Sequence, residues 1–424
     1  MDKLLVHGNG SLNGSINISG SKNASLPILA ATLLSERPSI VRRVPDVSDT
    51  NYMLQILRAL GAEVERSSGT VRVEPLSVSP EAPYDLVRKM RASICVMGPL
   101  LTRVGRAKIS LPGGCVIGDR PVDLHLKAME GLGAQVEMEG GDLILSAPKG
   151  LVGAEIDMQG KHGPTVLGTD NLMMAATLAR GTTVIESAAS EPEVVDLANF
   201  LTAMGARIEG AGTRRIVIEG VDELTAVEHT VIPDRIEAGT FMVAGAMAGE
   251  GITLRRVCED HLGAATEKIR EAGHLVQFSP DGTEVSVSPG GSGRGCDITT
   301  APYPGFPTDM QAQFTAMFAT TPGISLIEDA IFPHRFMHCS EMKRMGAEIK
   351  VDAGRAVVHG VDRLSAAPVM ASDLRASAAL VLAALTADGV TEINRLYHID
   401  RGYEMIDEKL LQLGANVERQ RGSA

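Results

Sequence analysis

The chain has 424 residues, which suggests two or three domains, and its 44% hydrophobic content can bury a sizeable core. A formal charge of −12 argues against a nucleic-acid scaffold or a general binder of anionic membranes, and 3% aromatic residues without Trp argues against base-stacking surfaces. No apolar run reaches the length of a membrane span, and the first residues lack the pattern of a secretory signal. Five widely spaced cysteines without a CxxC pair predict neither disulfides nor a zinc site, and favour a reducing cytoplasm.

The first predicted elements are a strand, a turn and a second strand over residues 4–20. This segment has no helix of its own. We therefore expect it to complete a unit that lies at the far end of the chain.

From residue 26 onward, one pattern recurs six times. Each copy has an apolar helix rich in small residues, a β-rich run, an amphipathic helix that ends at glycine, and a strand pair. Glycine suits the left-handed residue that commonly follows a helix. The six glycines are Gly61, Gly133, Gly205, Gly273, Gly346 and Gly414, at spacings of 72, 72, 68, 73 and 68 residues.

Six units of about 70 residues account for almost the whole chain, and a solenoid built from such long units without end caps would be unusual. We predict two α/β domains of three units each. One comprises residues 21–232, and the other residues 1–20 with 233–424. The chain then crosses twice between the domains, and we expect the ligand site in the cleft between them.

The segment SGSKNASLP (19–27) leads from a strand into a buried helix. The start of a helix favours an anion, and Lys22 could add a point charge there. An ordinary helix cap with a surface lysine is the alternative.

The segment SLPGGCVIGDRPVDLH (110–125) predicts a polar loop that carries Cys115. An exposed loop cysteine can act as a nucleophile or a proton donor. The alternative is that Cys115 is only a small turn residue.

Several arginines lie at predicted element boundaries. Guanidinium groups suit bidentate recognition of phosphate and carboxylate, so on an acidic chain this placement predicts a polyanion pocket. Taken singly, each could instead form a structural ion pair. The five are Arg91, Arg120, Arg335, Arg375 and Arg401.

Asp309 opens an apolar helix in FPTDMQAQ (306–313). It could accept a proton from a substrate hydroxyl, or it could simply cap the helix.

Taken together, these motifs resemble the enolpyruvyl transferases that act on UDP-N-acetylglucosamine. The resemblance covers Ser19 to Glu418 and is carried in order by SGSKNASLP, LPGGCVIGDRPVDLH, EPEVVDLANFL, PDRIEAGTF, FPTDMQAQF, FPHRFMH, DLRASAALVLA and YHIDRGYE. It implies two inside-out α/β barrel domains, each of three pseudo-symmetric units with buried central helices. It also implies transfer of the enolpyruvyl group of phosphoenolpyruvate to the 3′-hydroxyl of UDP-N-acetylglucosamine, with release of phosphate.

The same resemblance assigns roles to the residues that match its motifs. Lys22, Arg120 and Arg401 would bind the phosphate of phosphoenolpyruvate. Arg335 and Arg375 would hold the carboxylate side, and Arg91 would help to shape the pocket. Asn23 and Asp309 would contact the sugar, with Ile331 packed nearby. The uridine-diphosphate site would be lined by Arg120, Pro121, Val122, Asp123 and Leu124.

In the implied chemistry, Cys115 protonates C3 of phosphoenolpyruvate and Asp309 takes the proton of the sugar hydroxyl. Because an acid catalyst must be protonated whereas cationic surroundings lower a thiol pKa, we expect Cys115 to titrate near the working pH and to form a covalent adduct with phosphoenolpyruvate. No metal or organic cofactor is implied. The hydrophobic content without a long exposed apolar run predicts a monomer.

One segment departs from the family pattern. Where a SVGATEN-like run usually contacts the pyrophosphate, this chain has KHGPTVLGTDNLMM (161–174). The sequence therefore does not decide whether Thr165, Val166 and Leu167 contact the nucleotide. Lys161 could make the pyrophosphate contact in their place. The departure keeps two alternatives: an enolpyruvyl transferase with another nucleotide acceptor, and a non-catalytic paralogue that binds UDP-sugar. The intact Cys115 argues against the paralogue.

Overall fold

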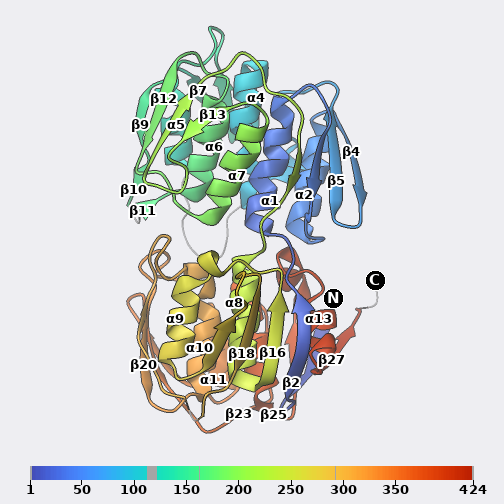
Figure 1. The fold of residues 1–424 in the computed structure, drawn as a ribbon, viewed down its shortest axis with the longest axis vertical. Coiled ribbons are helices and arrows are strands. Elements are labelled where there is room, and N and C mark those ends of the chain that lie inside the picture. Colours follow the sequence, from blue (N-terminus) through green and yellow to red (C-terminus); the bar gives the residue numbers. More distant parts are fainter. Residues whose placement is uncertain (1, 112–121, 162, 292, 423–424) are drawn as a thin grey trace. The chain divides into compact units, whose positions relative to one another are not determined.

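The computed structural model describes residues 2–111, 122–161, 163–291 and 293–422. These residues form two compact units (Figure 1). The first unit contains residues 20–111 and 122–232, and the second contains residues 2–19 and 233–422. Each has its own hydrophobic core. Within the described ranges, no helix is both long enough and apolar enough to cross a membrane.

The centre of each unit is made of three helices rich in small residues, which pack against one another. In the last of them, every residue from Arg375 to Leu385 is buried, as the nearly uniform apolar sequence predicts. The predicted helix that starts at Arg91 begins as a 3₁₀ helix, η2 (Arg91–Val96), before it becomes α-helical. The six central helices are α1 (Lys22–Ala31), α4 (Met97–Val104) and α6 (Val166–Ala176) in the first unit, and α8 (Arg235–Ala248), α10 (Gln311–Thr320) and α12 (Leu374–Leu385) in the second.

A second set of six helices is amphipathic. In the first of them, Met53, Leu54 and Leu57 line the buried face. The six are α2 (Ser48–Ala59), α5 (Asp123–Gly131), α7 (Pro192–Ala203), α9 (Gly263–Glu271), α11 (Met337–Arg344) and α13 (Ile406–Gln412). Each of the six repeat glycines follows one of these helices with φ between +88° and +110°, which confirms the left-handed conformation predicted for them.

Three sheets lie outside the central helices of the first unit (Figure 1). In each, the strand pair predicted after the amphipathic helix is an antiparallel hairpin. Their strand orders are β15 (Glu228–Thr230), β3 (Ser39–Arg42), β5 (Thr70–Pro75), β4 (Ala62–Ser67); β6 (Arg106–Ser110), β8 (Asp142–Ser146), β7 (Gln135–Glu139); and β13 (Arg207–Glu209), β14 (Arg215–Glu219), β12 (Thr182–Glu186), β9 (Glu155–Asp157). Smaller elements are η1 (Thr32–Leu34), α3 (Tyr84–Val87), β10 (Gln159–Gly160) and β11 (Gly163–Pro164).

The described residues of the second unit also form three larger sheets, beside one two-stranded pair, and they repeat the same plan. Their strand orders are β17 (Leu275–Phe278), β18 (Glu284–Ser288), β16 (Gly249–Arg255), β2 (Leu12–Asn17); β19 (Ile298–Thr299), β20 (Ile324–Glu328), β22 (Arg355–His359), β21 (Glu348–Asp352); and β24 (Pro368–Met370), β26 (Val390–Asn394), β1 (Lys3–His7), β27 (Asn416–Gln420). Smaller elements are η3 (Glu259–His261), η4 (Thr308–Met310), η5 (Leu396–Arg401), β23 (Leu364–Ser365) and β25 (Ala387–Asp388).

The two N-terminal strands join different sheets. Strand β1 lies between β26 and β27, with Leu4 opposite both Ile393 and Arg419, so it completes the sixth repeat as predicted. Strand β2 instead pairs in parallel with β16 of the fourth repeat, which places Ile16 in the core. The expectation that the whole segment completes the last repeat is therefore right for β1 and wrong for β2.

Candidate active site

The second unit brings three of the predicted site residues together around one carboxylate. Asp309 lies in η4, immediately before α10. Arg335 Nη1 donates to Asp309 Oδ1 over 2.7 Å, and Arg375 Nη2 donates to Asp309 Oδ2 over 3.0 Å. In this cluster of Asp309, Arg335 and Arg375, the arginine side chains are only 7% and 3% exposed and that of Asp309 is 28% exposed, so the guanidinium groups are shielded from water while the carboxylate is partly open to it.

The arginines decide the protonation state of Asp309. Burial by itself raises the pKa of this carboxyl, but the charges of Arg375 and Arg335 and their hydrogen bonds outweigh it, and the pKa lies well below its usual range. Asp309 is therefore ionised and is a weak base in this arrangement. The helix-cap alternative is wrong, because the N-cap position of α10 is Met310 and the Asp309 carboxylate is turned to the guanidinium groups.

Residues that the motifs did not single out hold this cluster in place. Arg335 Nη1 also donates to Thr308 Oγ1 over 3.1 Å, and Thr308 Oγ1 donates to Asp329 Oδ2 over 2.7 Å. Asp329 is 1% exposed and accepts the backbone N–H groups of Ile331 and Phe332 at 3.1 and 2.8 Å. The loop that carries the predicted sugar contact Ile331 is thus tied to the arginine cluster. In the sequence, Asp329 is marked only as an acidic residue at the end of the predicted strand segment LIED.

Arg375 is fixed by its helix and by an aromatic ring. Asp373 caps α12 and accepts from the backbone N–H of Arg375 at 3.0 Å and from that of Ala376 at 3.1 Å. The guanidinium carbon of Arg375 lies 5.4 Å from the centre of the Tyr403 ring. The Tyr403 hydroxyl is 2.9 Å from Thr240 Oγ1, so a buried polar network holds the ring.

Arg401 is the last residue of η5 in the same unit, and it is half-buried. Burial lowers the pKa of His398, and the positive charge of Arg401 lowers it further. His398 is therefore neutral near pH 7.

The first unit holds three more predicted site residues. Lys22 and Asn23 open α1, whose N-cap Ser21 accepts from the backbone N–H of Ala24 at 3.3 Å. Lys22 is only 9% exposed, and its Nζ is 3.2 Å from Asp49 Oδ2, so the surface-lysine alternative is wrong. Arg91 opens η2, which packs against α1.

Part of the predicted nucleotide site lies outside the described residues, namely Cys115, Arg120 and Pro121. Val122 directly precedes α5 and accepts the backbone N–H of Leu126 at 3.1 Å. Asp123 is exposed and Leu124 is half-buried in the first turn of that helix.

The similarity to known proteins extends over almost the whole chain. A family model described as EPSP synthase (3-phosphoshikimate 1-carboxyvinyltransferase) matches residues 6–410. The chain belongs to this family of enolpyruvyl transferases.

Individual relatives within this family show how similar the chain is to named proteins. The chain is 70% identical over 419 residues to the UDP-N-acetylglucosamine 1-carboxyvinyltransferase of Akkermansia muciniphila and 56% identical over 420 residues to that of Methylacidiphilum infernorum, with 99% of each chain covered. Among solved structures, the enolpyruvyl transferase NikO from Streptomyces tendae is 26% identical with a TM-score of 0.89 over 100% of this chain and 99% of its own. EPSP synthase from Acinetobacter baumannii, at 16% identity and a TM-score of 0.78 over 99% of this chain and 100% of its own, shows the shared fold.

The divergent segment of this enolpyruvyl transferase forms a short hairpin that leads into a capped helix. Strands β10 and β11 pair antiparallel, with Gly160 opposite Gly163. Thr165 is the N-cap of α6, and its Oγ1 accepts from the backbone N–H of Gly168 at 3.2 Å. The Thr165 hydroxyl is thus engaged by its own helix.

The four described cysteines of this enolpyruvyl transferase are poor nucleophiles. Burial raises the pKa of Cys296 to about 11 and that of Cys339 to about 12. Burial also raises the pKa of Cys95 and Cys258. None of these four thiols is therefore favoured as a thiolate near neutral pH.

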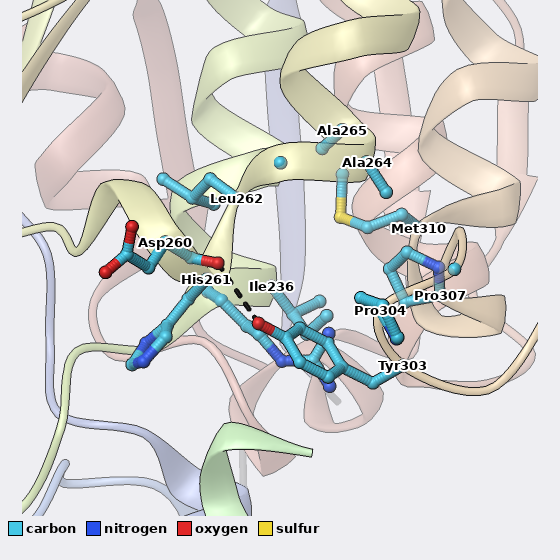
Figure 2. A pocket seen from close by; sticks show the side chains of 13 residues that line it. Ile236, Asp260, His261, Leu262, Ala264, Ala265, Tyr303, Pro304, Pro307 and Met310 are labelled. Carbon is cyan, nitrogen blue, oxygen red and sulfur yellow. Dashed lines mark hydrogen bonds between the residues drawn. The ribbon is translucent and has the colours of Figure 1, made fainter. Parts of the chain in front are cut away.

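A small pocket lies at the start of α8 and α9 (Figure 2). Its volume of about 50 Å³ suffices for no more than a few water molecules. Tyr303 closes one side, where its hydroxyl donates to the carbonyl oxygen of Asp260 over 3.1 Å and its ring lies 5.5 Å from the Arg235 guanidinium carbon. The pocket contains none of the predicted site residues and is too small for a nucleotide sugar.

Proposed function

We propose that this chain transfers the enolpyruvyl group of phosphoenolpyruvate to the 3′-hydroxyl of UDP-N-acetylglucosamine and releases phosphate, the first committed step of peptidoglycan synthesis. The observation that carries the proposal is the 70% identity over 99% of both chains to a protein of that name. The buried cluster of Asp309, Arg335 and Arg375 supports it, because guanidinium groups held rigidly in a shielded site suit a small dianionic substrate.

We propose an anion-binding role for each of five positively charged residues. Arg335 and Arg375 bind the carboxylate side of phosphoenolpyruvate, while Lys22, Arg120 and Arg401 bind its phosphate. The Nε atoms of Arg335 and Arg375 are buried without a hydrogen-bond partner among the described residues, so the cluster retains hydrogen-bonding capacity that folding alone does not use. Arg91 shapes the same pocket.

The acceptor is held by a second group of residues. Asn23 and Asp309 contact the sugar, and Ile331 packs beside it at the position that Asp329 fixes. The nucleotide part of the acceptor contacts residues 120–124 at and before the start of α5.

The chemistry is an addition followed by an elimination. The Cys115 thiol gives a proton to C3 of phosphoenolpyruvate, and the developing positive charge at C2 is attacked by the sugar hydroxyl oxygen, whose proton passes to Asp309. The tetrahedral ketal then loses phosphate from C2, which takes the proton held by Asp309, and a proton from C3, which returns to the Cys115 sulfur, so the carbon–carbon double bond is restored. Carbon oxidation states are unchanged overall, so the reaction needs no external oxidant or reductant.

Substrate binding makes Asp309 a better base. Asp309 is a weak base while Arg335 and Arg375 both hold it. An anionic substrate bound to the same guanidinium groups offsets their positive charge, so the pKa of Asp309 rises when phosphoenolpyruvate binds. The base is then activated only in the complex that reacts.

We further propose that the protein works as a monomer in the cytoplasm, where its precursor substrates are made. The four described cysteines are free thiols, as expected in a reducing compartment.

The test is phosphate release from phosphoenolpyruvate, measured with and without UDP-N-acetylglucosamine. We expect release that depends on the nucleotide sugar and that falls by about a hundredfold or more in Cys115→Ala, because a positioned acid contributes at least that factor. The matched control is Cys258→Ala, which removes a half-buried thiol outside the site and should leave the rate unchanged.

Two results would count against this function. If the wild type binds UDP-N-acetylglucosamine but releases no phosphate, the chain is a non-catalytic paralogue. If release requires a different nucleotide acceptor, the divergent residues 161–174 have changed the acceptor and the proposal is wrong on that point.

A further inference from the structure

The amide of Asn171 joins three other elements inside the first unit. Asn171 lies on α6 and is fully buried. Its Oδ1 accepts from the backbone N–H of Gly98 on α4 at 3.0 Å. Its Nδ2 donates to the carbonyl oxygen of Ile94 on η2 over 2.9 Å and lies 3.0 Å from Nδ1 of His125 on α5.

The two backbone partners fix which way the amide points. A backbone N–H can only donate and a carbonyl oxygen can only accept, so Oδ1 must face Gly98 and Nδ2 must face Ile94. The nitrogen that faces His125 is then a donor, and His125 Nδ1 must accept. The imidazole is therefore neutral and carries its proton on Nε2, because a protonated ring would set one N–H against another.

The close packing around Asn171 leaves no room for adjustment. A Cβ added at Gly98 would lie 2.5 Å from the Asn171 carbonyl oxygen and 3.2 Å from Oδ1, so α4 and α6 meet at backbone distance here. The helices α4 and α5 both pack against α6 (Figure 1), and His125 is 3% exposed. The amide thus joins three elements at a closely packed position.

Two of the tied elements begin at proposed substrate contacts. Helix α5 begins at Asp123, two residues before His125, and Asp123 and Leu124 are among the contacts proposed for the nucleotide sugar. Element η2 begins at Arg91, three residues before Ile94. Both partners of Asn171 therefore lie within one helical turn of these starts.

We propose that Asn171 is a positioning residue for the nucleotide sugar, which it orients by fixing His125 as the neutral Nε2–H tautomer and so fixing the start of α5. The proposal rests on the function proposed above. It assigns Asn171 no contact with substrate, and its effect is on the placement of residues 122–124.

The variant that isolates this role is Asn171→Asp. An ionised carboxylate at this position can still accept from Gly98 N–H, but it cannot donate to Ile94 or to His125. His125 must then turn its proton to Nδ1. We expect nitrogen NMR of the imidazole to show a neutral Nε2–H ring in the wild type and an Nδ1–H or doubly protonated ring in the variant.

The kinetic expectation is specific to one substrate. The KM for UDP-N-acetylglucosamine, and its Kd by calorimetry, should rise by about tenfold to a hundredfold in Asn171→Asp, because small misplacements have effects of this size. The KM for phosphoenolpyruvate should stay within twofold. The matched control is Thr169→Val on the same helix, which removes the acceptor of the Ala189 backbone N–H and the donor to the Thr165 carbonyl oxygen but keeps the hydrogen bonds of Asn171 to η2, α4 and α5. It should change the stability without changing the tautomer or the nucleotide-sugar affinity.

The possible outcomes separate this proposal from the proposed function. An Nδ1–H or protonated His125 in the wild type would overturn it, as would equal changes in the KM of both substrates or the same affinity loss in Thr169→Val. The tautomer and the Kd are measured without turnover. A wild type that binds the sugar without releasing phosphate would therefore refute the enzyme function while these two measurements still decide the role of Asn171.

Discussion

Arg375 and Asp309 are 66 residues apart in the chain, yet Arg375 Nη2 donates to Asp309 Oδ2 over 3.0 Å. Arg335 binds the other carboxylate oxygen, so one aspartate is shared by two guanidinium ions. Under the function proposed above, this relationship would let the arginines bind an anion, and the strength of the aspartate as a base would depend on what they bind.

Removing the shared carboxylate should destabilise the fold. In Asp309→Ala, two nearly buried guanidinium ions lose their partner, and we expect a loss of about 2–4 kcal/mol in the free energy of unfolding at pH 7.5 by urea denaturation. The matched control is Glu228→Ala, which breaks an exposed pair with Arg42 and should cost less than about 1 kcal/mol. Equal losses in the two variants would contradict the shielding inferred for the cluster.

The same carboxylate should give the protein an acid-sensitive stability. Because the folded-state pKa of Asp309 is below its unfolded value, its contribution is fully present above about pH 4 and is lost as the pH falls through the folded pKa. We therefore expect the wild-type unfolding free energy to fall more steeply below pH 4 than that of Asp309→Asn. Parallel profiles for the two proteins would refute this assignment.

Asp170 should show the opposite pH dependence. Its side chain is fully buried on α6, and neither oxygen has a hydrogen-bond partner among the described residues. Burial raises its pKa, and the charges of Glu191 and Glu193 raise it further. The folded state therefore holds a proton that the unfolded state has released above about pH 4, and stability falls as the pH rises from there toward the folded pKa.

Asp170→Asn removes that proton linkage. We expect the gain in Tm of the variant over the wild type to be larger at pH 8 than at pH 5, measured by differential scanning fluorimetry. Asp85→Asn, at a side chain that is 80% exposed, serves as the control and should show no such trend. A difference that is the same at all pH values would rule out the raised pKa.

Gly20 should not tolerate a side chain. An added Cβ would lie 1.8 Å from the carbonyl oxygen of Arg43, so the backbone must move just before α1 and Lys22. We expect Gly20→Ala to lose about 3 kcal/mol or more of unfolding free energy. Gly10→Ala is the matched control, because its Cβ would meet no atom within 4 Å, and it should stay within about 0.5 kcal/mol.

The cap of α12 should affect both stability and substrate binding. Asp373→Ala removes the acceptor of the Arg375 and Ala376 backbone N–H groups, so we expect a loss of about 1 kcal/mol. Because Arg375 is in the first turn, the KM for phosphoenolpyruvate should also rise. Asp373→Ser retains a capping oxygen and should restore most of both properties; failure of that rescue would assign the effect to the Asp373 charge instead of the cap.

The local features of this protein could be predicted from its sequence. Two of these features depend on patterns within about 20 residues, namely the left-handed glycines after the amphipathic helices and the buried central helices. The six-fold repeat is the recurrence of those patterns along the chain. Each is confirmed. The same patterns located Asp309, Arg335 and Arg375 as candidate site residues. Whether Lys22 is a surface residue and whether Asp309 is a helix cap could not be settled in that way, because burial and ion pairing depend on neighbours that are distant in sequence.

The sequence by itself therefore determined the repeating unit, its secondary structure and the chemical types available to the site. Only the tertiary structure decided that β1 inserts between β26 and β27 while β2 joins β16, and that two arginines meet on one aspartate. The physical reason is that strand pairing and buried ion pairs are selected by the packing of the whole chain, since each alternative partner satisfies the same local pattern.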